Sequence, residues 1–190
     1  VWWFYCSANS TEIDKYVVYN YLEQIWYYGS MARSSWFDSG LLPYPFATTY
    51  NPNTQVGRLL YHESGLNDNT DGTEYAIDAY ISSSEFDIGD GHNFGFIWRI
   101  IPDLTFSNST NAPDGTSPRV TMTLQGLYNS GSGRIDTASG IVSKSSAYLI
   151  TEEFTGQLFT RVRGRQLIFE IESNQLNTAW QLGEIGRAHV

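Results

Sequence analysis

The chain has 190 residues, of which 11 are Lys or Arg and 20 are Asp or Glu, so its formal net charge is −9 at pH 7. This length can bury the core of one large or two small domains, and the acidic balance argues against a broad surface that grips nucleic acid. Aromatic residues make up 15% of the chain, which suits sheet faces and interfaces. The single cysteine, Cys6, excludes a disulfide within these residues. We expect no membrane-spanning segment, because no apolar run approaches the ~20 residues that cross a bilayer.

Residues 1–66 contain short strand-like runs separated by polar turns. Val1–Gly29 predicts two or three strands, and Tyr16–Tyr21 is apolar on both faces, which is typical of a sheet covered on both sides. No apolar stripe with a 3.6-residue period lasts for three turns, so no helix is predicted. Further strands are expected at Met31–Asp38, Pro45–Tyr50 and Arg58–Glu63. We interpret residues 1–66 as an aromatic, β-propeller-like fragment.

A polar linker, residues 67–75, separates this fragment from longer strands. Residues 76–183 are interpreted as a β-sandwich-like module with Ser-, Gly-, Asn- and Pro-rich connections. The expected strands are Tyr75–Phe86, Phe94–Phe106, Val120–Tyr128, Tyr148–Glu153 and Leu158–Glu172. The predicted fold class is therefore all-β, built from antiparallel sheets.

Three arginines alternate along the last of these strands, at positions that an extended chain would place on one face about 7 Å apart. They are Arg161, Arg163 and Arg165. Because the apolar residues of Leu167–Ile171 continue the same parity, we predict a bulge at Gly164 that shifts the register. Val162 would then point inward before the bulge and the apolar residues after it. The arginines are either a positive strip on a channel wall or subunit contact, or a solvated face with acidic cross-strand partners.

Several polar clusters resemble metal-binding or acid–base catalytic sites, but each has a simpler structural interpretation. Asn67–Asp78 mimics a calcium loop, or is an Asx-rich turn. Asp87, Asp90 and His92 form either a metal or acid–base cluster or a hairpin turn. Glu152 and Glu153 point to opposite faces of a strand. With no GxSxG, P-loop or HExxH motif, we predict no catalytic residue, no metal site, no cofactor and no enzymatic activity.

Two stretches resemble a known family: FDIGDGHNFGFIWRIIPDLTF at Phe86–Phe106, and TRVRGRQLIFEIES at Thr160–Ser173 followed by TAWQLG. They are similar to the tail nozzle, tail hub or packaged-DNA stabilisation proteins of short-tailed bacteriophages (podoviruses). The N-terminal WWFYCSANSTEIDKYVVYNYLEQIWYYG resembles a propeller blade of those proteins, so the resemblance spans residues 1–183.

The resemblance implies a structural virion component. It implies a ring of identical copies, expected to be a hexamer, that closes the portal, retains packaged DNA and forms the ejection conduit. The implied partners are the portal and adaptor, other tail proteins and, transiently, viral double-stranded DNA. The implied location is the phage tail, with the host cytoplasm during assembly.

The two ends of the chain suggest a piece of a longer reading frame from a metagenomic assembly. Val1 falls in the middle of a strand-like run, and residues 184–190, EIGRAHV, look like the translation of a common sequencing adapter. We expect these seven residues to be a non-native tail and leave them out of the fold prediction.

Five tryptophans distinguish the remaining hypotheses: Trp2, Trp3, Trp26, Trp36 and Trp98. Exposed, they would anchor contacts between copies. Gathered on one concave face, they would stack on sugars, and the chain would be a carbohydrate- or receptor-binding module of a tail or secreted protein. A propeller hydrolase is the third hypothesis, which requires two carboxylates about 5–10 Å apart, and the sequence offers no such pair.

Overall fold

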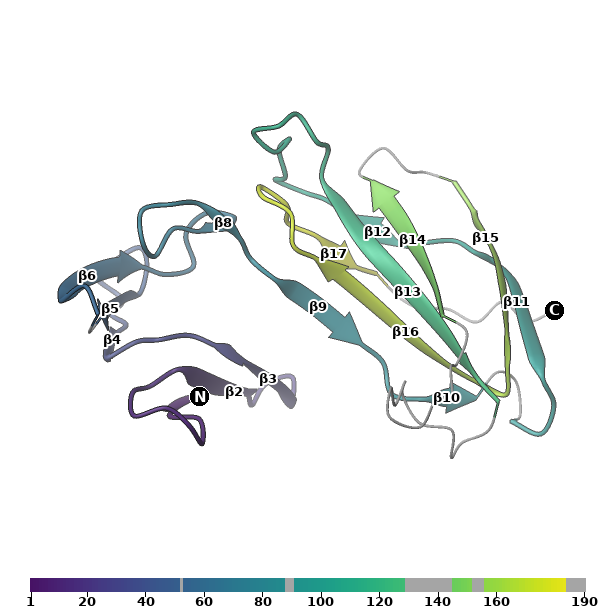
Figure 1. The fold of residues 1–190 in the computed structure, drawn as a ribbon, viewed down its shortest axis with the longest axis horizontal. Coiled ribbons are helices and arrows are strands. Elements are labelled where there is room, and N and C mark those ends of the chain that lie inside the picture. The colour runs from purple at the N-terminus through teal and green to yellow at the C-terminus, as the bar shows by residue number, and fades with distance from the viewer. Residues whose placement is uncertain (52, 88–90, 129–144, 152–155, 184–190) are drawn as a thin grey trace. The chain divides into compact units, whose positions relative to one another are not determined.

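The computed structural model describes residues 1–51, 53–87, 91–128, 145–151 and 156–183 (Figure 1). Throughout these residues the regular secondary structure consists of β-strands, and every strand pairing is antiparallel. The all-β prediction is confirmed. The chain divides into two compact units, Val1–Gly65 (unit 1) and Leu66–Val190 (unit 2). The propeller and sandwich assignments stay predictions.

Unit 1 contains two three-stranded sheets, each a simple meander in the orders β1-β2-β3 and β4-β5-β6. Their strands are β1 (Trp2–Tyr5), β2 (Lys15–Asn20), β3 (Ile25–Ser30), β4 (Ser35–Phe37), β5 (Phe46–Asn51) and β6 (Val56–Tyr61). The three strands expected between residues 31 and 63 correspond to β4, β5 and β6, with shifted ends.

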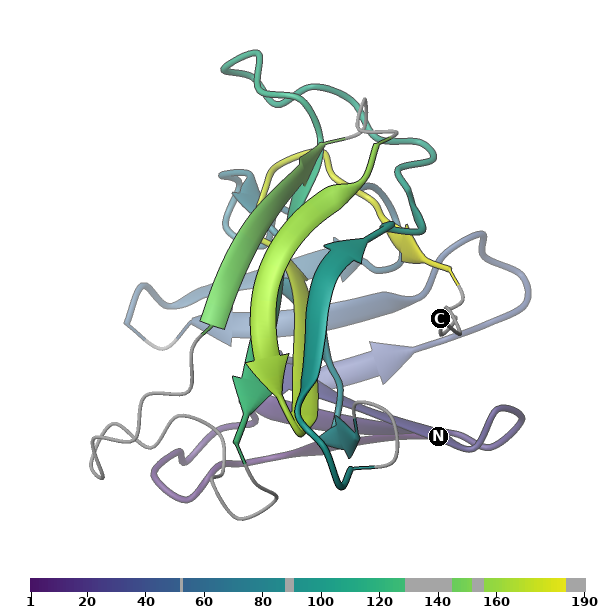
Figure 2. The same cartoon turned by 90° about the vertical axis from the view of Figure 1, so that its right-hand side faces the viewer.

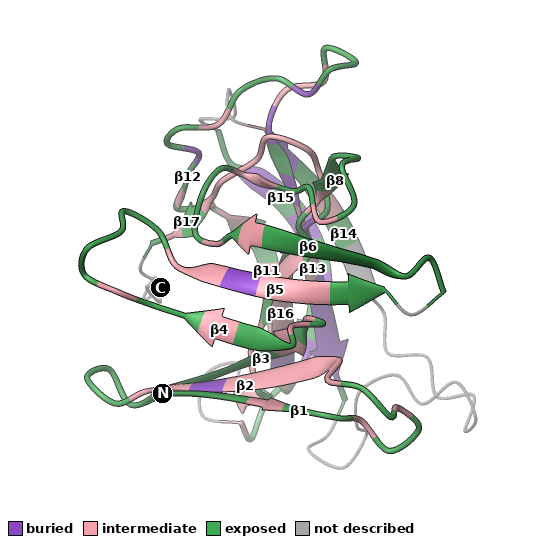
Figure 3. Cartoon of the chain, turned by 90° about the vertical axis from the view of Figure 1, so that its left-hand side faces the viewer, coloured by how far each residue is buried: buried purple, intermediate pink, exposed green. Residues whose placement is uncertain are grey.

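The two sheets of unit 1 pack against each other through aromatic side chains. The ring of Trp36 in β4 lies 5.3 Å from that of Trp2 and 5.7 Å from that of Phe4, both in β1. Val18 in β2 and Ala47 in β5 are buried, and Figure 3 shows these buried segments in the middle strands of the two sheets. Alternation along a strand places every second residue on the opposite face, and those outer faces are largely exposed. The sheets are thus covered on one side, whereas the apolar pattern of β2 predicted cover on both.

Unit 2 is built on a five-stranded sheet with the order β10-β16-β13-β14, in which β9 also pairs with β16. Its strands are β9 (Ala79–Ser82), β10 (Phe86–Asp87), β13 (Arg119–Leu127), β14 (Ser145–Thr151) and β16 (Gln166–Ser173). Three two-stranded sheets complete the unit: β7 (Asn67–Asp68) with β8 (Tyr75–Ala76), β11 (Gly95–Ile100) with β15 (Leu158–Gly164), and β12 (Leu104–Thr105) with β17 (Gln181–Leu182).

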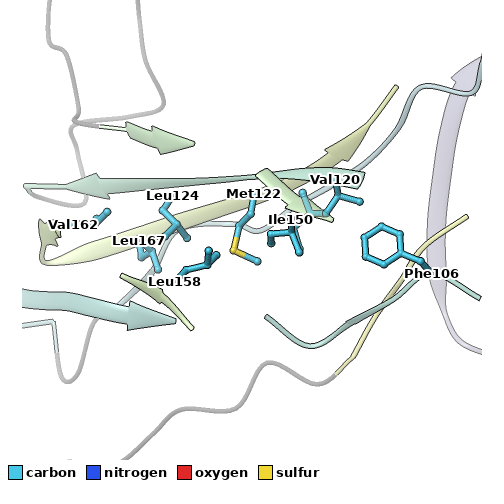
Figure 4. Packing of buried hydrophobic residues seen from close by; sticks show 9 residues of the cluster. Phe106, Val120, Met122, Leu124, Ile150, Leu158, Val162 and Leu167 are labelled. Atoms are coloured by element: carbon cyan, nitrogen blue, oxygen red, sulfur yellow. The ribbon is translucent and has the colours of Figure 1, made fainter. Parts of the chain in front are cut away.

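The core of unit 2 takes one face of the five-stranded sheet and one face of β15 (Figure 4). It contains Val120, Met122 and Leu124 of β13, Ile150 of β14, Leu158 and Val162 of β15, Leu167 and Ile171 of β16, and Phe106. Burial of each such side chain stabilises the fold by about 1.5–3 kcal/mol relative to its exposed state. The alternating pattern of β15 follows directly, because its buried positions face this core and the intervening positions face solvent.

The single strand expected at Leu158–Glu172 is wrong, because the chain bends at Arg165 and changes sheets. β15 pairs with β11, whereas β16 pairs with β13. Gly164 lies against β13, where a Cβ atom would approach the backbone oxygen of Leu127 to 2.7 Å. The Arg165 amide donates a hydrogen bond of 2.8 Å to that oxygen. The parity change predicted at Gly164 is confirmed, but a bend between two sheets produces it rather than a bulge within one strand.

Other strand expectations also change where the chain passes from one sheet to another. Tyr75–Phe86 divides into β8, β9 and β10, and Phe94–Phe106 divides into β11 and β12. The hairpin turn interpreted at Asp87–His92 includes residues 88–90, which lie outside the described residues; the strands on either side pair with different partners, β10 with β16 and β11 with β15. The predicted linker, residues 67–75, instead supplies most of the small β7–β8 hairpin. A local sequence pattern cannot distinguish one long strand from consecutive pieces that pair with different partners.

Candidate functional site

The outer face of the β11–β15 pair combines arginines with exposed aromatic rings. Figure 2 shows β11 in teal and β15 in yellow-green, side by side on the near side of unit 2. We call this surface the Arg–aromatic face: Phe94, Phe96, Trp98, Arg99, Phe159, Arg161, Arg163 and Arg165. All eight side chains are exposed, including Phe96 at 57%, Trp98 at 50% and Phe159 at 70%. The face therefore presents a large apolar area and four positive charges together.

Strand register determines which of these side chains are neighbours. Phe96 of β11 lies opposite Arg163 of β15, and Arg99 lies opposite Phe159. The register shifts between Ile97 and Arg99, which places both Trp98 and Arg99 on the exposed side instead of alternating them. The shifted register therefore places Arg99 on this face beside Trp98, whereas Ile100 packs against the core.

The guanidinium groups pack over the rings. Arg163 and Arg165 lie 5.0 Å and 5.3 Å from the ring centre of Phe94, and Arg99 lies 4.7 Å from that of Trp98. Each cation–π contact at an exposed site contributes about 0.5–1 kcal/mol. The contacts orient the arginines over the rings.

The structure brings the three predicted arginines to one side of unit 2. One of the two interpretations expected acidic residues opposite them on the neighbouring strand. That prediction is wrong for β11, which places Phe96 opposite Arg163. Arg99 donates from Nη1 to Oε1 of Gln157 at 3.3 Å. Of the aromatic half of the face, sequence reasoning named Trp98 but missed Phe94, Phe96 and Phe159. The alternation of Phe96 and Trp98 with Gly95 and Ile97 is a two-residue period that could have indicated Phe96.

The five predicted tryptophans do not share one surface. Trp2 and Trp36 stack between the two sheets of unit 1, and Trp98 belongs to the Arg–aromatic face of unit 2. Trp3 and Trp26 stack on the outer face of the β1–β2–β3 sheet, with ring centres 6.0 Å apart. The concave platform of five rings that sugar binding would favour is therefore absent from the part of the chain that the structure describes.

Both sheets of unit 1 present exposed aromatic side chains on their outer faces. We call these the outer faces of unit 1. On the first sheet they include Trp3, Tyr5, Trp26 and Tyr28, which are 45%, 47%, 60% and 71% exposed. On the second they include Phe37, Tyr50, Leu59 and Tyr61, which are 58%, 49%, 65% and 62% exposed. Sheet faces of this composition are typical of surfaces that are covered in an assembly.

An open hollow lies at one end of the first sheet of unit 1, with a volume of about 450 Å³. Its walls are mostly aromatic: Val1, Trp2, Tyr16, Val18, Tyr19, Asn20, Tyr21 and Tyr27. Asn20 supplies a carboxamide there, although its oxygen already accepts from the amide of Leu22 and its nitrogen donates to Glu23.

Local hydrogen bonds engage two carboxylates that were considered as metal ligands, Asp68 and Asp71. In the calcium-like loop, the carboxylate of Asp68 accepts from the Thr70 amide at 2.9 Å, and that of Asp71 from the Thr73 amide at 2.8 Å. These are bonds of an Asx-rich turn. Within the described residues no group of three or more His, Cys, Asp and Glu is placed to hold a metal ion. Asp90, Glu152 and Glu153 lie outside the described residues.

The carboxylate of Asp14 is held by two hydrogen bonds from one residue, Ser7. It accepts from the Ser7 hydroxyl at 2.6 Å and from the Ser7 amide at 2.7 Å. These two hydrogen bonds lower the pKa of Asp14 below its ordinary value, because they stabilise the charged form. The group closes the turn between β1 and β2.

In the described part of the chain, no helix has the length and apolarity required to cross a membrane. A scan against models of known protein families found no match, and a search of the curated proteins found none either.

Proposed function

We propose that the chain is a structural component of a short-tailed phage tail, part of a nozzle or hub ring that closes the portal, retains packaged DNA and forms the ejection conduit. The proposal starts from the resemblance at Phe86–Phe106 and Thr160–Ser173. The observation that supports it most is the pair of outer faces of unit 1, because an assembly protein needs surfaces that are buried only on association.

The area involved is large enough to drive association. A fully buried aromatic side chain covers about 150–250 Å², so four rings about half exposed present roughly 400 Å² on one outer face. At about 25 cal/mol per Å², covering that area contributes about 10 kcal/mol before the entropy cost of association. One such face matches the largest apolar patch of a typical monomer, and unit 1 has two.

Net charge is compatible with a conduit. Each phosphate held by a Lys or Arg adds counterion-release affinity, so DNA would slide poorly along a basic wall. A chain with 20 acidic and 11 basic residues repels the phosphate backbone over most of its surface. Transient contact at a few arginines is the most that this balance allows, and rapid ejection requires no more.

Electron microscopy of the full-length product tests the proposal. We expect closed rings of identical copies, which bind the portal–adaptor complex when the components are mixed. A product that stays monomeric at micromolar concentration, both alone and with the portal–adaptor complex, would exclude the ring role.

Carbohydrate or receptor binding is the second candidate, and the aromatic hollow of unit 1 favours it. Tyr21 and Tyr27 are 64% and 47% exposed there and could stack on a sugar ring. A glycan array would detect such binding, and Tyr27→Ala should then reduce the affinity at least tenfold. Tyr44→Ala is the matched control, because Tyr44 is 43% exposed and lies outside the hollow. Equal effects of both substitutions, or an empty array, would reject this function.

A further inference from the structure

Charge is distributed unevenly along the chain. Between Arg58 and Arg99 the sequence contains no Lys or Arg and eight Asp or Glu. The Arg–aromatic face, in contrast, holds four of the 11 basic residues. Without those four, seven basic residues remain against 20 acidic ones, so the rest of the chain has a net charge of −13. The Arg–aromatic face is a local positive surface on an otherwise strongly acidic chain.

The β7–β8 hairpin lies in this acidic stretch and presents Asp68, Asp71 and Glu74, all exposed. We call it the acidic hairpin. Tyr75, which is 51% exposed, adds an aromatic ring whose hydroxyl donates to Asp71 at 3.2 Å. The hairpin therefore combines negative charge with an apolar ring, which complements the positive charge and rings of the Arg–aromatic face.

Two hydrogen bonds anchor the acidic hairpin to the rest of unit 2. The side chain of Asn67 donates to Oδ1 of Asn177 at 2.7 Å and accepts from the Asn177 amide at 2.8 Å. The Asn177 side chain donates in turn to the Asn111 carbonyl at 3.1 Å. Because the hairpin is held in place, its carboxylates form a preorganised surface, which lowers the entropy cost of binding.

We propose that the Arg–aromatic face of one copy binds the acidic hairpin of a second copy. The inference deepens the proposed function, on which it rests for the ring, by naming the two surfaces that meet. Arginine and aromatic side chains are enriched at the centres of protein interfaces, where they supply most of the binding energy. Opposite charges select the partner surface and increase the association rate.

The same face is less suited to a nucleic acid. A polyanion bound at the four arginines would be repelled by the remaining charges of the chain, which sum to −13. The acidic hairpin, in contrast to a polyanion, carries only three carboxylates, and it also presents the exposed ring of Tyr75. The small local charge of the hairpin and its exposed ring therefore favour a protein surface over a polyanion.

The contact would be head to tail. Within unit 2, β8 lies at the end opposite to β11 and β15 in Figure 1, and the view of Figure 2 places β11 and β15 nearest the viewer with β8 behind them. Each copy therefore keeps one free surface of each kind after binding, and further copies can add. Heterologous contacts of this type produce a closed ring when the rotation between copies closes.

Sedimentation velocity of the 190-residue chain over a concentration series tests the contact. Variant A is Arg161→Glu with Arg163→Glu, and variant B is Asp71→Lys with Glu74→Lys. All four side chains are exposed, so both variants should fold. We expect wild type to self-associate, about 0.5 M salt to weaken the association, and either variant alone to lose at least tenfold in association constant. An equimolar mixture should form A–B dimers that do not extend further, since A keeps the acidic hairpin and B keeps the Arg–aromatic face, so that one wild-type contact per pair is restored.

Arg119→Glu is the control, because Arg119 is exposed and lies outside both surfaces; it should change little. If wild type associates but neither variant weakens it, the inference is overturned while a ring through the outer faces of unit 1 still stands. If wild type does not associate at any concentration, this contact is refuted, and electron microscopy of the full-length product decides the ring separately. Retardation of single-stranded or duplex DNA by wild type but not by variant A, without self-association, would assign the face to nucleic acid instead.

Discussion

Substituting Gly164 by alanine tests the bend that joins the two parts of the unit 2 core. A Cβ atom there would lie 2.7 Å from the oxygen and 2.8 Å from the nitrogen of Leu127, and 2.8 Å from the oxygen of Gln166. These are backbone atoms, so relief requires β13 and β15 to separate. Overpacking of this kind costs about 1–3 kcal/mol. Weakening the 2.8 Å hydrogen bond from Arg165 to Leu127 costs about 1 kcal/mol more. We expect a total loss of about 2–4 kcal/mol.

Hydrogen exchange of the β13 amides measures this loss within unit 2. Amides that exchange only through global opening report the free energy of unfolding, so exchange should accelerate roughly 30- to 700-fold at one decade per 1.4 kcal/mol. Gly40→Ala is the matched control, because a Cβ at Gly40 would have no neighbour within 4 Å. A Gly164→Ala variant within about 0.5 kcal/mol of wild type, the ordinary range for surface substitutions, would refute the close-approach argument.

Three further predictions follow from single contacts. Trp36→Ala should destabilise unit 1 by about 2–3 kcal/mol, since its ring contacts the rings of Trp2, Phe4 and His62. Urea unfolding should show this loss. Leu41→Ala is the control and should cause no comparable change, because Leu41 is 94% exposed. The Asp14 carboxyl should titrate below its ordinary pKa of 3.8 in a ¹³C NMR titration, so its stabilising contribution is present above that value and lost as the pH falls through the folded pKa. Ser7→Ala should move this pKa back up, and an unchanged titration would contradict the assigned cause. Asn177→Ala should accelerate hydrogen exchange in the β7–β8 hairpin more than in β13, and equal acceleration would show that the asparagine does not anchor the hairpin.

Side-chain alternation predicted most of the strands and, for residues 158–172, the side that faces the core. Val162 and Ile171 are buried as expected, because the two-residue period of a strand is a local property that any extended chain obeys. The change of parity at Gly164 could also be predicted from the sequence, since arginines and core residues could not share one face. The cause of the change could not be predicted. A bulge and a bend shift parity equally, and only the close approach of Gly164 to Leu127, which is distant in sequence, distinguishes them.

The candidate site was only half predictable for the same reason. The arginine spacing placed Arg161 and Arg163 together, because both lie on one strand. Their association with Phe96 depends on β11 being the partner of β15, and strand pairing is not encoded in the local pattern. In unit 1, apolar residues on both faces of β2 predicted a sheet covered on both sides. The sequence pattern does not determine whether the residues that cover each face come from the same chain or from another. Among the described residues of unit 1, the outer faces of its two sheets stay exposed.

The bend at Gly164 links the core of unit 2 to the Arg–aromatic face. On one continuous strand, Arg165 and Leu167 would have the same parity, so either a charge would enter the core or a leucine would leave it. Because the chain turns at Arg165 instead, Leu167 is 5% exposed in the core while Arg165 stays outside and lies over the Phe94 ring beside Arg163. Only glycine permits the close approach to β13 on which this turn depends. Gly164 permits the turn that brings Leu167 into the core, and the same turn places Arg165, the third arginine, on the exposed face. The packing of unit 2 and the composition of its surface therefore depend on the same local geometry.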